Sequence, residues 1–155
     1  MNLLPQRKQP AHPTPLVITN QPVIVFMTAC VKGKRPLLAS EVAHRLLTES
    51  WKRADLWRVG RYVIMPDHVH LFCAPADIEC RVRDWTGYWR NLVTRSWPCA
   101  SDKPIWQRDF WDTQLRREES YNEKWEYVRN NPVRAGLVQM PEEWPYAGEL
   151  NVLRW

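Results

Sequence analysis

The chain of 155 residues carries 22 lysines and arginines against 17 aspartates and glutamates, a formal net charge of +5. Hydrophobic residues make up 45% and charged residues 25%, which excludes a wholly disordered chain. The length is typical of one domain. No apolar run approaches the roughly 18–20 residues of a membrane span, so we expect a cytoplasmic protein without a membrane segment.

The numbers of tryptophans and cysteines exclude few classes of protein. Ten tryptophans and a basic charge are compatible with nucleic-acid binding, although an aromatic core under a mildly basic surface is the simpler interpretation. The four cysteines form no C-x-x-C pair, which argues against a zinc ribbon or a thioredoxin site. Cys30 and Cys73 lie in apolar runs and are expected to behave as small hydrophobic residues.

The chain begins with a proline-rich stretch. Five prolines in the first 22 residues predict an extended N-terminal arm over residues 1–21, followed by a single domain at 22–155. A β-branched apolar run predicts a buried strand at 23–31, and Ser40 offers a cap for a helix at 41–52. The remaining elements are predicted as strand, strand, helix, strand and helix, at residues 56–65, 68–74, 77–97, 110–115 and 118–130.

This order of elements is β-α-β-β-α-β, followed by a further helix and a tail. It is the split βαβ pattern of the ferredoxin-like fold, an α+β architecture with an antiparallel sheet and helices on one face. The turn at Pro66-Asp67 is so short that its two flanking strands must be antiparallel neighbours.

His68 and His70 form the first candidate site. Side chains alternate along a strand, so these two point to one face, with roughly 6–7 Å between their Cα atoms. Two imidazoles are too few for a structural zinc site, whereas an open site completed by oxygen ligands and a phosphate suits Mg²⁺ or Mn²⁺. Two half-exposed histidines without any metal remain an alternative.

A second candidate lies near the end of the last predicted helix. Tyr127 and Asn131 are four residues apart, which places them on one helical face. Tyr121 lies six residues before Tyr127, on a different face, and competes for any catalytic role. These tyrosines, with Trp125, could also be core contacts of an amphipathic helix.

Three segments together resemble a known family. MPDHVHLF (65–72), IWQRDFWDTQLRREESY (105–121) and YVRNNPVRAGLV (127–138) are similar to REP-associated tyrosine transposases. These are relatives of the insertion-sequence 200-like transposases in the HUH single-strand nuclease superfamily. The resemblance implies a ferredoxin-like fold, a DNA nickase and strand transferase acting on single-stranded DNA, and Mg²⁺ or Mn²⁺ as cofactor. By this resemblance, the metal ligands of the family correspond to His68, His70 and, as the third ligand, Asn131. The nucleophile that forms a 5′-phosphotyrosine corresponds to Tyr127.

The resemblance also implies a substrate, a repetitive extragenic palindrome (REP) folded as a DNA hairpin. It implies a bacterial, nucleoid-associated protein, for which a monomer is favoured and a dimer stays open. Basic residues then become candidate DNA contacts, although any one of them could equally be solvated or paired. These candidates are Lys34, Arg35, Arg83, Arg90, Arg116, Arg117, Arg129 and Arg134.

Tryptophans divide into two predicted groups. Trp85, Trp89 and Trp97 follow a helical stripe and are expected in the core. The other group could stack on unpaired bases; it comprises Trp57, Trp106 and Trp111. Two other functional classes stay open: a catalytically silent hairpin-binding module derived from a transposase, and another HUH enzyme such as a replication initiator or relaxase.

Overall fold

The computed structural model describes residues 23–77, 79–116 and 118–154. The predicted arm at 1–21 and Arg117 lie outside the described residues. The main elements are β1 (Ile24–Cys30), α1 (Glu41–Arg53), β2 (Trp57–Ile64), β3 (His68–Pro75), α2 (Val82–Ser96), β4 (Trp111–Leu115), α3 (Glu118–Arg129), α4 (Asn131–Arg134) and β5 (Ala147–Glu149). Three short 3₁₀ turns cover Lys32–Lys34, Ala100–Asp102 and Pro141–Glu143.

The strands form one sheet in the order β4-β1-β3-β2-β5, and every pair is antiparallel. The first four strands have the arrangement of a ferredoxin-like fold, so the predicted fold is confirmed. The sheet also contains β5, which pairs with the free edge of β2 and was expected only as part of the tail. Three residues without strong alternation give too little signal for a strand to be predicted.

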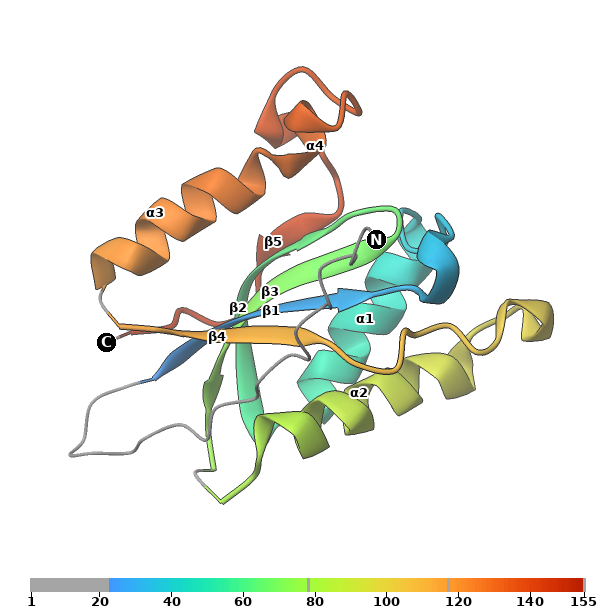
Figure 1. Ribbon diagram of the computed structural model, residues 1–155, viewed down its shortest axis with the longest axis horizontal. Helices are drawn as coiled ribbons and strands as arrows, with labels where there is room; N and C mark the ends of the chain where they lie inside the picture. Colours follow the sequence, from blue (N-terminus) through green and yellow to red (C-terminus); the bar gives the residue numbers. More distant parts are fainter. Residues whose placement is uncertain (1–22, 78, 117, 155) are drawn as a thin grey trace, which may run out of the picture.

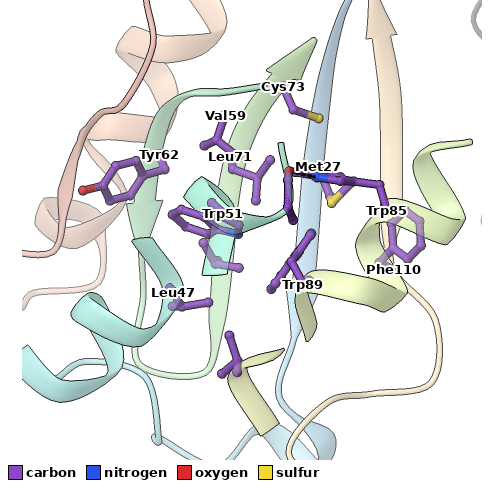
Figure 2. Packing of buried hydrophobic residues seen from close by; sticks show 14 of the residues in the cluster. Met27, Leu47, Trp51, Val59, Tyr62, Leu71, Cys73, Trp85, Trp89 and Phe110 are labelled. Atoms are coloured by element: carbon purple, nitrogen blue, oxygen red, sulfur yellow. Dashed lines mark hydrogen bonds between the residues drawn. The ribbon is translucent and has the colours of Figure 1, made fainter. Parts of the chain in front are cut away.

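Helices cover both faces of the sheet (Figure 1). On one face α1 and α2 pack as predicted, and Figure 2 shows their tryptophans meeting the strands around Met27 and Leu71. The opposite face carries α3, which was not expected to cover it. Its packing is explained by a second apolar cluster that includes Ile24 and Phe72 of the sheet with Tyr121 and Val128 of α3.

A β-bulge in β2 explains why the sequence of that strand alternates only partly. The pairing with β3 shifts between Val59 and Tyr62. Because of the shift, Val59 and Tyr62 both face α1 and α2 although they are three residues apart. An alanine Cβ at Gly60, inside the bulge, would lie 2.7 Å from the Leu153 side chain, so the close approach of the C-terminal segment requires glycine there.

The second helix begins later than predicted, at Val82 instead of residue 77. The Asp77 carboxylate accepts a hydrogen bond of 2.9 Å from the Glu79 amide, and the Cys80 amide donates to the Asp77 carbonyl. This local Asp turn competes with helix formation. None of the described helices is long and apolar enough to cross a membrane.

Candidate active site

The β1–β3 pairing builds the floor of the site. Pro66 and Asp67 connect β2 to β3, and His68 and His70 project from β3 onto the face that carries α3, while Val69 between them is buried in the core on the other face. Thr28 of β1 lies directly opposite His70 in the register. Its hydroxyl and the His70 Nδ1 share a hydrogen bond of 2.8 Å.

Both imidazoles are oriented through their Nδ1 atoms. His68 Nδ1 donates to the Asp67 carboxylate at 2.7 Å, and His70 is held by Thr28 on one edge and by stacking on Phe26, with ring centroids 5.4 Å apart. As a result the two Nε2 atoms lie 3.1 Å apart. A second partner on Nδ1 is the usual way in which proteins aim Nε2 at a metal ion.

His70 is neutral at physiological pH. Burial is the main cause that lowers its pKa to about 3, and His68, Lys124 and Arg134 contribute smaller electrostatic effects in the same direction. Only neutral imidazole can donate a lone pair to a metal. The environment therefore holds His70 in the protonation state that a ligand requires.

The two nitrogens fit a shared divalent cation. Two ligands at right angles around one ion, each about 2.1 Å from it, lie about 3.0 Å apart. The His68–His70 separation of 3.1 Å is close to this value. The donor set thus matches two adjacent positions of an octahedral ion and leaves the others open to oxygen ligands.

Tyr127 lies beside the histidines, near the end of α3. Its side chain is 61% exposed and lines an open cavity of about 420 Å³ together with His68, His70 and Asn131. Tyr121, its competitor, is only 4% exposed and packs edge-on against Phe72 at 4.9 Å. Burial also raises the pKa of Tyr121, which disfavours the phenolate that a nucleophile needs.

Asn131 reaches the same cavity from a separate helical turn. Helix α3 ends at Arg129, and a separate helical turn, α4, begins at Asn131. Pro132 explains the break, because proline lacks an N–H and clashes with the carbonyl four residues earlier. The interruption still leaves Tyr127 and Asn131 on one side of the cavity.

Arg134 connects these two residues. Its guanidinium lies 3.9 Å from the centre of the Tyr127 ring and donates from Nη2 to the Tyr127 carbonyl at 2.6 Å. The same nitrogen donates to the Asn131 side-chain oxygen. An amide oxygen has two lone pairs, so Asn131 can accept this hydrogen bond and still ligate a cation.

Sequence reasoning missed three residues of the site. Thr28 and Phe26 come from β1 and meet His70 only through the strand register. Lys124 lies one turn before Tyr127, with its ammonium 4.8 Å from the centre of the Phe26 ring and 5.8 Å from that of Tyr127. The i, i+3 spacing on a predicted helix was the available signal for Lys124.

Seven of the eight predicted DNA contacts are among the described residues, and they lie on several different elements. Arg134 lies in the site, Arg83 and Arg90 lie on α2, and Arg116 is exposed after β4. Lys34 is exposed in the turn after β1. Four of these arginines have partners within the protein. Arg35 donates to the carbonyls of residues 32, 102 and 104, and Arg129 pairs with Glu126 and Glu142. Arg90 donates to the Gln107 carbonyl, and Arg134 has the contacts with Tyr127 and Asn131 given above.

The predicted core tryptophans, Trp85, Trp89 and Trp97, are buried, so this expectation is confirmed. Trp57 is 1% exposed and donates from Nε1 to the Cys80 carbonyl, which makes the base-stacking hypothesis wrong for Trp57. Trp106 is partly buried against Trp89, whereas Trp111 is 36% exposed and open to a ligand.

Comparison with known proteins finds two curated relatives with similar sequences. No family model matches the chain. A REP-associated tyrosine transposase of Escherichia coli K12 is 27% identical over 97 residues, which are 62% of this chain and 56% of that protein. A Haemophilus influenzae protein provisionally given the same name is 28% identical over 95 residues, 54% of each chain. The chain thus spans about half the length of the curated relatives it matches.

A solved structure has a similar fold. The structure of a REP-associated tyrosine transposase bound to a REP hairpin superposes with a TM-score of 0.70 at 20% identity, covering 80% of this chain and 74% of that one. This likeness shows the shared fold. Together with the curated relatives, it confirms the predicted resemblance to the REP-associated tyrosine transposases.

Proposed function

We propose that this protein is a metal-dependent transposase that nicks and rejoins single-stranded DNA at palindromic hairpins. The observation that carries the proposal is the convergence of His68, His70, Tyr127 and Asn131 on one open cavity. Similarity to REP-associated tyrosine transposases supports DNA hairpins as substrate. We also propose that the protein acts at the nucleoid, where it would meet such hairpins in DNA.

The residues of the cavity suit phosphoryl transfer. Lys124 and Arg134 lie beside Tyr127 and give the rim a positive charge that attracts a DNA phosphate. His68, His70 and Asn131 would hold Mg²⁺ or Mn²⁺. When bound, the ion would neutralise the charge of the DNA phosphate and orient that phosphate for in-line attack.

The covalent step conserves the energy of the phosphodiester bond. The Tyr127 phenolic oxygen attacks phosphorus, and the bond from phosphorus to the 3′ oxygen breaks. The phenol proton is lost to solvent, and the departing oxygen takes up a proton to become a 3′-hydroxyl. The DNA 5′ phosphate stays on Tyr127 as a phosphotyrosine, so a 3′-hydroxyl of another strand can reverse the step and join DNA.

Strand selectivity tests this proposal. Labelled palindromic hairpins with single-stranded flanks are incubated with Mg²⁺, with Mn²⁺ or with a chelator, beside duplex DNA of the same sequence. We expect cleavage in the single-stranded flank, only with metal, and none in the duplex. Equal cutting of the duplex would overturn the proposal, and metal-independent hairpin binding without cleavage would identify a silent DNA-binding module.

Metal binding by the histidine pair gives a second prediction. Thr28→Val removes the hydroxyl that orients His70, and loss of such an outer partner typically weakens metal binding about 10- to 100-fold. Mn²⁺ binding to the free protein is followed by electron paramagnetic resonance. Thr48→Val on α1, on the other side of the sheet, is the matched control and should bind as the unmodified protein does. Equal Mn²⁺ affinity of Thr28→Val and the control would contradict this role.

A further inference from the structure

A groove separate from the histidine site runs between α2 and the segment at residues 104–110. It consists of two adjoining hollows, of about 470 and 280 Å³, which share Gly87, Arg90, Asn91 and Arg108. The groove belongs to the side of the sheet that carries α2, whereas His68 and His70 face α3 on the opposite side (Figure 1). The proposed cleavage reaction makes no use of it.

Gly87 is the unexpected residue of this groove. It lies in the middle of α2, where glycine is a poor helix former, and it has no positive φ that would require glycine. A Cβ added there would meet nothing within 4 Å. Neither backbone conformation nor internal packing therefore explains the glycine, whereas the close approach of a bound group would.

The residues around Gly87 suit a nucleic-acid strand. Tyr88 is 50% exposed and offers an aromatic face for a base, and Arg108 is exposed for a phosphate. Arg90 is fixed by donation to the Gln107 carbonyl at 2.9 Å and lies over the Phe110 ring. Arg83 adds a third guanidinium. Two carboxylates also line the groove, Asp84 and Asp109.

The groove leads toward the cleavage site. Its outer wall, residues 104–110, continues directly into the edge strand β4, whose first residue is the exposed Trp111. Trp111 pairs in register with Thr28, which in turn contacts His70. A strand leaving the groove can therefore pass Trp111 at the sheet edge and reach the histidines.

We propose that this groove binds a single-stranded DNA segment, with a base stacked on Tyr88, the backbone passing close over Gly87 and phosphates on Arg83 and Arg108. The choice of DNA as the polymer rests on the proposed function. The groove would then hold a flank of the substrate while another part of the same strand lies at Tyr127.

Fluorescence anisotropy with a labelled oligothymidylate tests the groove in a Tyr127→Phe background, where binding is measured without any cleavage. We expect Tyr88→Ala to weaken binding about 5- to 150-fold, the range for loss of one base stack. Arg108→Ala should lower the slope of log affinity against log salt by about 0.7. Arg45→Ala, which removes an exposed arginine of α1, is the matched control and should change neither.

Gly87→Ala and Gly87→Leu separate binding from folding. Both replace glycine with a better helix former in open space, so the melting temperature should stay equal or rise while oligothymidylate affinity falls, more for leucine. Unchanged affinity in the Tyr88 and Gly87 variants, or no oligothymidylate binding at all, would overturn the proposal that this groove binds single-stranded DNA. A missing covalent adduct in the protein with Tyr127 intact would instead overturn the proposed function and leave the groove measurement standing.

Discussion

Replacing Tyr127 by phenylalanine is expected to abolish covalent capture of DNA. The substitution removes only the phenolic oxygen, which is the atom that would bond to phosphorus, and phenylalanine offers no replacement. The side chain is 61% exposed, so the fold loses little when the hydroxyl is removed. Denaturing gel electrophoresis with labelled single-stranded hairpin substrates and Mn²⁺ measures the adduct directly.

Tyr121→Phe is the matched control, because it makes the same chemical change in the same helix six residues earlier. Its ring is packed on Phe72 and buried, away from the cavity that holds Tyr127. The Tyr121 variant should keep its adduct, and DNA binding by both variants should stay measurable. A full adduct yield in Tyr127→Phe would show that another residue is the nucleophile.

Trp89→Ala is expected to lower the free energy of unfolding by about 3–5 kcal/mol, the usual cost of removing a buried tryptophan. Trp89 has no exposed surface, and its ring packs edge-on against Trp51 at 5.9 Å and Trp106 at 5.3 Å. Truncation would leave a large cavity where α1, α2 and the sheet meet (Figure 2). Urea unfolding followed by circular dichroism measures the loss.

The adjacent residue provides the control for Trp89. Tyr88→Ala removes an aromatic ring from the same helix, but from its exposed face. The free energy of unfolding should then change by less than about 0.5 kcal/mol. Equal losses in the two variants would contradict the assignment of Trp89 to the core of the domain.

The fold was largely predictable because local patterns determine most of it. The turn at Pro66 and Asp67 fixes β2 and β3 as neighbours, and strand alternation places His68 and His70 on one face. The addition of β5 and the packing of α3 on the second face depend on contacts between distant segments. Their local sequence carried too little signal to show them.

The candidate residues of the site could be named from the sequence, but the hydrogen bonds and ring contacts between them could not. The spacing of His68 and His70 allowed a shared metal ion but left two metal-free histidines as an alternative, and the family resemblance implied Tyr127 and Asn131. The hydrogen bond between Thr28 and His70 and the bridging position of Arg134 needed three-dimensional structure. Trp57 was predicted wrongly: it was proposed for base stacking, but it is buried, stacks on Trp85 and donates a hydrogen bond to the Cys80 carbonyl.

Peptide mapping of the covalent adduct tests the central claim most directly. Trypsin cuts after Lys124 and Arg129, so Tyr127 and Tyr121 fall into different peptides of this sequence. After reaction with single-stranded hairpin DNA and Mg²⁺ or Mn²⁺, mass spectrometry should find the nucleotide on the peptide at residues 125–129. No adduct should form when a chelator is present from the start of the reaction. A nucleotide on any other peptide, or an adduct that forms equally without metal, would contradict the assignment of Tyr127 beside a histidine-bound cation.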